Sequence, residues 1–176
     1  MCIRDRFEYG SIRAANMVQE GKLDLALVNM HFYEIDKLNS FTVMNDKIVF
    51  CVSKSHPLAK CHEVTIEMLK DEPLIMYNTD SVQNETLDTA FKRAGVNPNV
   101  ILHASQLYTI RNFICNNLGG AFLYSSLQKN LSGTTGIPIS PVINQNIGIV
   151  WKKGSYTTDS AEKLSLIHIS EPTRQE

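Results

Sequence analysis

The interior of this chain alternates short apolar runs with amphipathic helical patterns, and this alternation does most to limit the folds open to it. The runs KLDLALVN (22–29) and KIVFCVS (47–53) predict strands that are apolar on both faces. The segment ETLDTAFKRAG (85–95) predicts a helix, because its apolar residues recur at helical spacing and Gly95 stands where a left-handed C-cap belongs. Strands and helices that alternate over short loops predict an α/β fold whose largely parallel sheet is covered on both faces.

The same alternation continues through the rest of the chain. A short helix is expected over 64–72 with Thr65 as its N-cap, and a longer one is expected after Ser105, which would cap it. The apolar stripe of the longer helix comprises Leu107, Ile110, Ile114 and Leu118. Further strands are expected at LIMYN (74–78), NVILHA (99–104), AFLY (121–124) and IGIVW (147–151).

The composition is that of a globular protein and argues against several functional classes. Of the 176 residues, 43% are hydrophobic and 20% are charged, which suits one domain or two small lobes. A formal net charge of −1 provides no electrostatic footprint for nucleic acid. No apolar run approaches the roughly 18 residues that span a bilayer, and nothing at the start resembles a signal peptide. The four cysteines are scattered without a disulfide framework, so we expect a reducing, cytoplasmic setting and no membrane partner.

The segment CVSKSHPLAKCH (51–62) concentrates two cysteines and two histidines within a dozen positions. Three readings are open: a small zinc site, a thiol–imidazole nucleophile, or a structural turn. Zinc knuckles normally carry a tight Cys-x-x-Cys pair, which is missing here, and no basic group is evident that would lower the pKa of either thiol. Cys51 lies in an apolar run, where a lone cysteine usually behaves as a small hydrophobic residue. These observations favour a structural role for the segment.

Signals for catalysis are lacking elsewhere in the sequence. The chain contains no G-x-S-x-G elbow, no P-loop, no G-x-G-x-x-G and no H-E-x-x-H motif. Asp24 and Asp88 could in principle form a general acid–base pair, but a strand position and a helix flank favour structural or solvated roles. We expect no catalytic residues, no metal site and no cofactor.

Several longer motifs are similar to those of one known family. In their order and spacing they resemble the effector-binding domain of LysR-type transcriptional regulators, and the resemblance covers roughly residues 8–164. Two positions depart from the family pattern: Asn117 stands where a glycine is usual, and Tyr124 stands where a proline often ends the strand. Asn117 is compatible with that position because asparagine enters left-handed conformations more readily than most residues. The motifs are EGKLDLAL (20–27), HPLA (56–59), VTIEMLKDEPLI (64–75), LDTAFKRAGVNP (87–98) and NLGGAFL (117–123). For the segment 51–62, the resemblance implies a turn fixed by Pro57, in which His56 forms local hydrogen bonds.

The resemblance implies a two-lobed α/β fold like that of type II periplasmic binding proteins, each lobe a mostly parallel sheet flanked by helices. Lobe I would comprise 7–44 and 146–164, without the family's first strand, and lobe II would comprise 45–145. The implied function is sensing of a small-molecule effector for a transcription regulator. In that reading the chain is truncated: the helix-turn-helix domain that would bind DNA is missing, and the full-length parent would form a homo-dimer or tetramer. The alternative is a free-standing solute-binding protein for a small anionic ligand.

The resemblance also implies where a ligand would bind. The effector would lie in the cleft of the two-lobed fold, where strand ends and helix N-termini converge. Hydroxyl and amide groups beside exposed backbone N–H groups suit a carboxylate or another small anion. Plain capping or turn chemistry is the alternative role for each of these residues. The candidate ligand-binding residues are Asn29, Asn78, Thr79, Ser81, Ser105 and Gln106.

The two ends of the chain do not continue the pattern of the interior. MCIRDR (1–6) and SLIHISEPTRQE (165–176) resemble translated sequencing-adapter read-through, although ordinary polar tails are the alternative. We therefore leave Cys2 and His168 out of any site and interpret both tails as non-native.

Deletion of both tails is expected to change the free energy of unfolding by no more than about 0.5 kcal/mol, the range typical of surface changes. Scanning calorimetry of the chain with and without residues 1–6 and 165–176 measures this. A large drop in the melting temperature would show that the tails are genuine parts of the domain.

Overall fold

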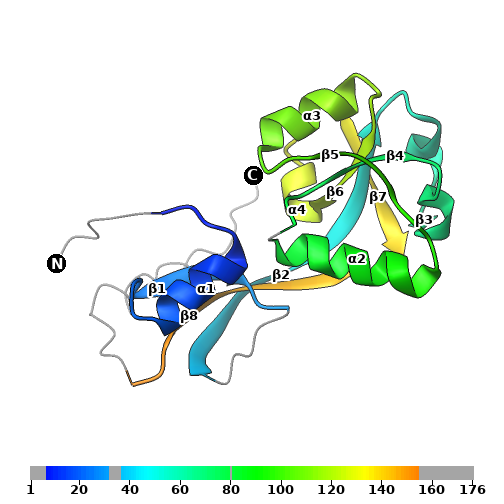
Figure 1. Ribbon diagram of the computed structural model, residues 1–176. Helices are drawn as coiled ribbons and strands as arrows, with labels where there is room; N and C mark the ends of the chain where they lie inside the picture. The colour runs from blue at the N-terminus through cyan, green and yellow to red at the C-terminus, as the bar shows by residue number, and fades with distance from the viewer. Residues whose placement is uncertain (1–6, 32–36, 80, 155–176) are drawn as a thin grey trace. The chain divides into compact units, whose positions relative to one another are not determined.

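The computed structural model describes residues 7–31, 37–79 and 81–154, so both tails lie outside the described residues (Figure 1). The chain divides into two compact units. Unit 1 takes its residues from the two ends of the chain, up to Asn45 and from Asn146 onward, and unit 2 comprises Asp46–Gln145. Two long strands, β2 (Leu38–Ser53) and β8 (Asn144–Lys152), contain the points at which the chain passes from one unit to the other.

Unit 1 is built on helix α1 (Ser11–Gln19) and strand β1 (Leu25–Asn29), which runs antiparallel to β8. β1 begins later than the predicted 22–29 because the N–H groups of Lys22 and Leu23 donate to the carbonyl of Met17 and so complete the end of α1. Gly21 makes this turn possible with a φ of 73°. The core of the unit consists of Ala14, Ala15, Val18, Ala26, Val28, Leu38 and Val150.

Unit 2 contains a mixed sheet. Strand β4 (Pro73–Met76) is parallel to both β5 (Asn99–His103) and β6 (Gly120–Tyr124). The second half of β2 is antiparallel to β6 and to β7 (Thr134–Ser140). The sheet is therefore less uniformly parallel than expected, because an apolar run predicts burial on both faces but carries no information on strand direction.

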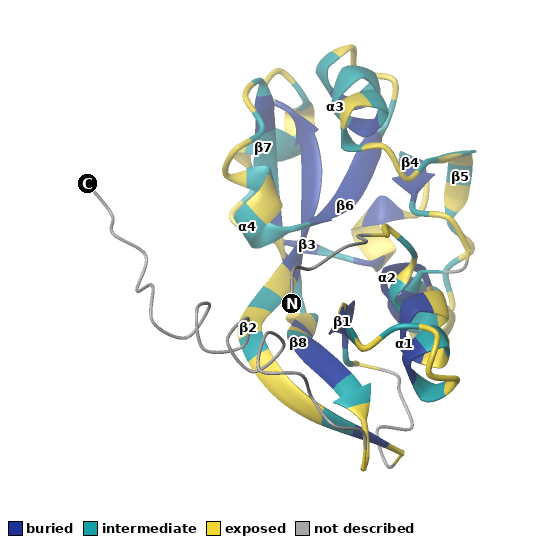
Figure 2. Ribbon diagram, turned by 90° about the vertical axis from the view of Figure 1, so that its left-hand side faces the viewer, coloured by how far each residue is buried: buried dark blue, intermediate teal, exposed yellow. Residues whose placement is uncertain are grey.

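Side chains that alternate along the strands of unit 2 form two separate cores. Phe50 on β2, Leu74 on β4 and Phe122 on β6 point to the face covered by α2 (Val82–Ala94), as do Ile137 and Ile139 on β7. The residues between them point to the face covered by α3 (Leu107–Cys115); they include Val49, Cys51, Ile75, Ala121 and Leu123. In Figure 2, β4 and β6 are buried along most of their length, and the same holds for residues 48–53 of β2. The prediction of a strand covered on both faces is confirmed for residues 48–53 of the predicted 47–53 strand. It is wrong for 22–29, because Leu27 on β1 is 63% exposed.

Helix ends in unit 2 follow the sequence signals in some places and differ in others. Gly95 adopts φ 66° at the end of α2, and Asn117 adopts φ 55° after α3, so both left-handed positions are confirmed. The prediction that Ser105 caps α3 is wrong. The helix begins one residue later, since the carbonyl of Gln106 accepts the first bond from the N–H of Ile110, and no side chain caps it. Leu118, placed on the apolar stripe, lies beyond the helix and is exposed.

The helix predicted over 64–72 is also wrong. Val64 and Thr65 form a short strand, β3, which pairs in parallel with Ile139 and Ser140 of β7. Only Glu67–Leu69 is helical, as a 3₁₀ turn. A pairing partner more than seventy positions away overrides the local helical pattern, and a window of local sequence does not contain that information. Of the helices in the described ranges, none is long and apolar enough to cross a membrane.

Gly120→Ala tests how closely β6 and β2 approach in this core. A Cβ atom at position 120 would lie 2.2 Å from Cζ of Phe50, whose side chain is fully buried. We expect a loss of about 1–3 kcal/mol in the free energy of unfolding, the usual cost of overpacking.

Urea denaturation measures this loss, and the double variant Gly120→Ala with Phe50→Leu is the control. The smaller side chain relieves the overlap, so the double variant should lose less than the sum of the two single losses. Strict additivity would show that the two positions do not interact.

Candidate functional site

Three parallel strands of unit 2 end at the same edge of the sheet, and polar residues follow each of them. Because β5 and β6 are both parallel to β4, their carboxyl ends lie together. Tyr77, Asn78 and Thr79 follow β4, Ser105 and Gln106 follow β5, and Ser125 follows β6. Open α/β sheets bind ligands outside the carboxyl ends of their strands. This carboxyl edge is the candidate site.

Asn78 and Ser81, which lie between β4 and α2, take part in short-range hydrogen bonds. The Oγ atom of Ser81 accepts from the N–H of Asn84 at 3.1 Å, and the N–H of Ser81 donates to the carbonyl of Asn78 at 3.1 Å. Ser81 is thus the N-cap of α2, while Asn78 and Thr79 are exposed. The capping role is observed, and contact of these three residues with a ligand stays a prediction.

The exit of β5 is tied to the exit of β4. The N–H of Ala104 donates to the carbonyl of Met76 at 3.0 Å, and Nδ1 of His103 lies 3.0 Å from the carbonyl oxygen of Tyr77. Ser105 and Gln106 follow directly and are exposed. The structure therefore brings five of the six predicted site residues to one edge, on two neighbouring loops.

Asn29, the sixth predicted residue, belongs to unit 1. It is buried at the end of β1, its backbone N–H donates to Oγ of Ser11 at 3.0 Å, and its Oδ1 accepts from the N–H of His31 at 3.0 Å. These bonds give Asn29 a role in the turn that follows the strand. Ligand binding by Asn29 stays a prediction.

Tyr77 directly follows β4 and has a partly buried side chain. Its side chain packs against the core on the α3 face, and burial raises its pKa to about 12, with Tyr124 and Cys51 nearby adding to the shift. The phenol therefore stays protonated at neutral pH and can donate a hydrogen bond. Sequence reasoning assigned Tyr77 to a strand and overlooked it as a site residue.

Gln83 is a second residue that the sequence did not reveal. It lies in the first turn of α2, ahead of the predicted helix start at 85, and only 4% of its surface is exposed. Its Nε2 atom donates to the carbonyl of Phe122 on β6 at 2.7 Å. A polar side chain outside any recognised motif carries no local sign of such a distant partner.

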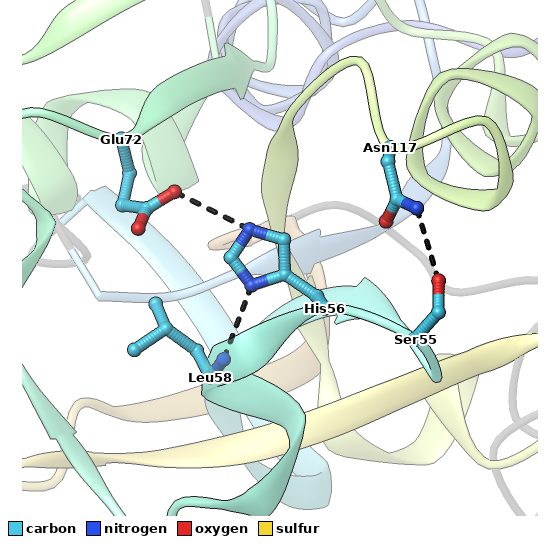
Figure 3. Close-up of polar contacts among 5 residues, drawn as sticks. All are labelled: Ser55, His56, Leu58, Glu72 and Asn117. Carbon is cyan, nitrogen blue, oxygen red and sulfur yellow. Dashed lines mark hydrogen bonds and ion pairs between the residues drawn. The ribbon is translucent and has the colours of Figure 1, made fainter.

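The CVSKSHPLAKCH segment (51–62) forms a turn that begins at the C-terminal end of β2 (Figure 3). Nδ1 of His56 accepts from the N–H of Leu58 at 3.3 Å, and its Nε2 lies 3.4 Å from Oε2 of Glu72. Beside it, Nδ2 of Asn117 donates to Oγ of Ser55 at 2.9 Å. The expected local hydrogen bonding of His56 is confirmed.

Neither chemical reading of this segment is supported by the geometry. Cys51 is fully buried, and burial raises the pKa of its thiol far above the ordinary value, which disfavours the nucleophilic thiolate. Within the described ranges, no three His, Cys, Asp or Glu residues lie close enough to hold a metal ion. Because β2 runs antiparallel to β6, the turn after Ser53 lies at the edge of the sheet opposite to the candidate site.

Comparison with known proteins shows what the chain resembles. Residues 7–165 match the family model described as the LysR substrate binding domain. The chain is 32% identical over 157 residues to the uncharacterized HTH-type transcriptional regulator YwbI of Bacillus subtilis, a match covering 88% of this chain and 52% of that protein. It is 32% identical over 108 residues to the HTH-type transcriptional regulator CysB of Haemophilus influenzae, covering 61% of this chain and 33% of that protein. The chain thus spans about half, or less, of the length of these curated relatives.

Solved structures establish the fold. The Synechocystis PCC6803 CcmR regulatory domain, in complex with 2-PG, superposes with a TM-score of 0.82 at 20% identity, covering 92% of this chain and 79% of that one. The effector binding domain of QuiR, in complex with shikimate, superposes with a TM-score of 0.78 at 16% identity, covering 92% and 78%. The predicted α/β fold of the type II periplasmic-binding-protein kind is confirmed.

His56→Ala tests the structural reading of the turn. The variant removes the cap of the 3₁₀ helix Pro57–Lys60 and the contact with Glu72, so we expect a loss of about 1 kcal/mol in the free energy of unfolding, most of it from the cap. Urea denaturation measures the loss. His62→Ala, which changes an exposed histidine close by, is the matched control and should cost much less. Equal losses in the two variants would contradict a specific role for His56.

Proposed function

Because this chain belongs to the LysR substrate-binding domain family, we propose that it senses a small-molecule effector on behalf of a transcription regulator. The observation that carries the proposal is the carboxyl edge of unit 2, where two loops bring hydroxyl and amide groups next to the starts of two helices. DNA binding would belong to the remainder of a full-length regulator, since the relatives are named HTH-type regulators and the matches cover only 52% of each.

We propose that the two compact units act as the two lobes of the sensor, over residues 7–44 with 146–164 and over 45–145. The division of the chain at Asn45 and Gln145 supports this assignment. Loops at strand ends are held by the rigid sheet but remain free to differ in sequence, which suits a sensor whose effector differs among relatives.

The proposed ligand is a carboxylate or another small anion. Helix N-termini favour negative charge, and both α2 and α3 begin at the candidate edge. Neutral donors surround these N-termini: Thr79, Ser81 and Ser105 offer hydroxyl groups, and Asn78 and Gln106 offer amides. The solved complexes of two relatives with 2-PG and with shikimate support a small polar effector.

The proposed mechanism is a population shift. An effector stabilises one arrangement of the sensor by its differential affinity for the two states, and in a dimer or tetramer this changes how protomers pack and where the DNA-binding domains lie. No chemical step is required of the chain, so we propose a role without catalysis, in the cytoplasm. The names of the curated relatives favour this reading over a free-standing solute-binding protein.

A thermal-shift screen of small carboxylic acids and phosphate esters tests the proposal, first on this chain and then on a version extended at its N-terminus as in its longer relatives. An acid that binds should raise the melting temperature, and the rise should grow with the logarithm of its concentration once this exceeds the Kd. A complete absence of binders in both versions would contradict the sensing role.

Substitutions at the edge then test the site. Thr79→Val or Ser105→Ala should weaken calorimetric binding of the strongest acid by about tenfold, as expected for the loss of one charge-assisted hydrogen bond. Thr89→Val is the matched control, because Thr89 donates within α2 to the carbonyl of Glu85 at 2.9 Å, away from this edge. Unchanged affinity in both edge variants would place the site elsewhere.

A further inference from the structure

The first three residues of α2 are buried, although two of them are polar. Val82, Gln83 and Asn84 are all less than 5% exposed. Glutamine is mostly exposed in proteins, and a buried amide is costly unless it is hydrogen-bonded. The 2.7 Å bond from Nε2 of Gln83 to the carbonyl of Phe122 meets this need. The bond connects two segments 39 residues apart, so it belongs to the tertiary structure rather than to the helix.

The bond occurs just where two strands stop pairing. β4 pairs with β6 only at Leu74 with Gly120 and at Ile75 with Ala121. On its other side β4 continues to pair with β5, as far as Met76 with His103. Phe122, whose carbonyl Gln83 contacts, is the next residue of β6 after the last pair. The amide of Gln83 thus supplies a donor to β6 immediately beyond the point at which β4 separates from it.

We propose that Gln83 is a positioning residue, which attaches the N-terminus of α2 to β6 and so holds Asn78, Thr79 and Ser81 in place at the carboxyl edge. Two bonds act on the same turn: Ser81 caps it from within the helix, and Gln83 ties it to the sheet. Without the bond from Gln83, Ser81 still caps α2, but the N-terminus of α2 then loses this side-chain attachment to β6. The importance of this loop for a ligand rests on the proposed function; the attachment itself does not.

Gln83→Met is the first test, since methionine has similar length and no donor. In this variant we expect amide hydrogen exchange to accelerate about tenfold at residues 82–85 and 122–124, the size expected for one lost hydrogen bond. The NMR signals of Asn78, Thr79 and Ser81 should shift or broaden at the same time.

Thr86→Val is the matched control. Thr86 is buried in the same helix, but its Oγ1 donates to the carbonyl of Val82 at 2.9 Å, so the bond lies inside α2. This variant should leave the exchange of residues 122–124 and the signals of Asn78 and Thr79 unchanged. If Gln83→Met and Thr86→Val had the same effects, or if the effects of Gln83→Met spread evenly over the chain, the proposal would be wrong.

Gln83→Glu provides a rescue that depends on pH. A protonated carboxylic acid can donate its O–H to the carbonyl of Phe122, whereas a carboxylate only accepts. Burial and this bond both favour the neutral acid, so the pKa of the introduced carboxyl group would be raised above the ordinary value of about 4.3. The variant should therefore resemble the wild type at acid pH and lose stability as the pH rises from that ordinary value through the raised pKa.

NMR spectra of Gln83→Glu at pH 5 and pH 8 decide the matter. Wild-type signals for the loop at pH 5 and signals like those of Gln83→Met at pH 8 would support the attachment. Identical loop signals at the two pH values, corrected for the wild-type response, would overturn it. None of these measurements uses a ligand, so their outcome is independent of the effector screen.

Discussion

The fold of unit 2 depends on one strand segment that is buried on both faces. Residues 48–53 of β2 pair on one side with β6 and on the other with β7, and their side chains alternate between two cores. Phe50 packs beneath α2 with Phe122, at a ring distance of 5.2 Å, while Cys51 packs beneath α3. Such a segment tolerates neither a charge nor an unpaired backbone group on either face. The helices α2 and α3 pack on the two faces to which this segment contributes, and β6, which ends at the carboxyl edge, pairs with it.

Local patterns in the sequence predicted those features that are decided locally. The strands that apolar runs predict and the C-cap at Gly95 follow from a few neighbouring residues, and the left-handed Asn117 was expected from the family resemblance. Failures occurred where a distant partner decides the outcome. The pairing of Val64 and Thr65 with β7 replaced a predicted helix, and the contact between Gln83 and Phe122 left no trace in the local pattern. The error at Ser105 has another cause. Ser105 and Gln106 could each be the N-cap of α3, and only the backbone geometry shows that it is Gln106.

The candidate site combines a rigid frame with loops that carry the chemistry. β4, β5 and β6 form the frame, and the polar residues lie directly beyond their ends. Family motifs describe this frame well because glycines, capping residues and apolar runs recur wherever the frame is built. In the proposed site, the identity of the ligand would depend instead on side chains such as Thr79 and Gln106, which the frame does not require. Resemblance therefore supports a proposal for the place of a ligand more than a proposal for its identity.

The pairing of β4 with β5 contains an irregularity that affects whether β5 can pair with a strand of another chain. Leu74 pairs with Val100 and Ile75 pairs with Leu102, so Ile101 is an extra residue in β5 with no partner opposite it. β5 ends the strand order, and Ile101 is 45% exposed. A regular, uncharged edge strand can pair with a strand of another polypeptide. A bulge bends the strand and interrupts its regular row of backbone donors and acceptors. The bulge at Ile101 therefore protects this border from aggregation without any Lys, Arg, Asp or Glu in β5.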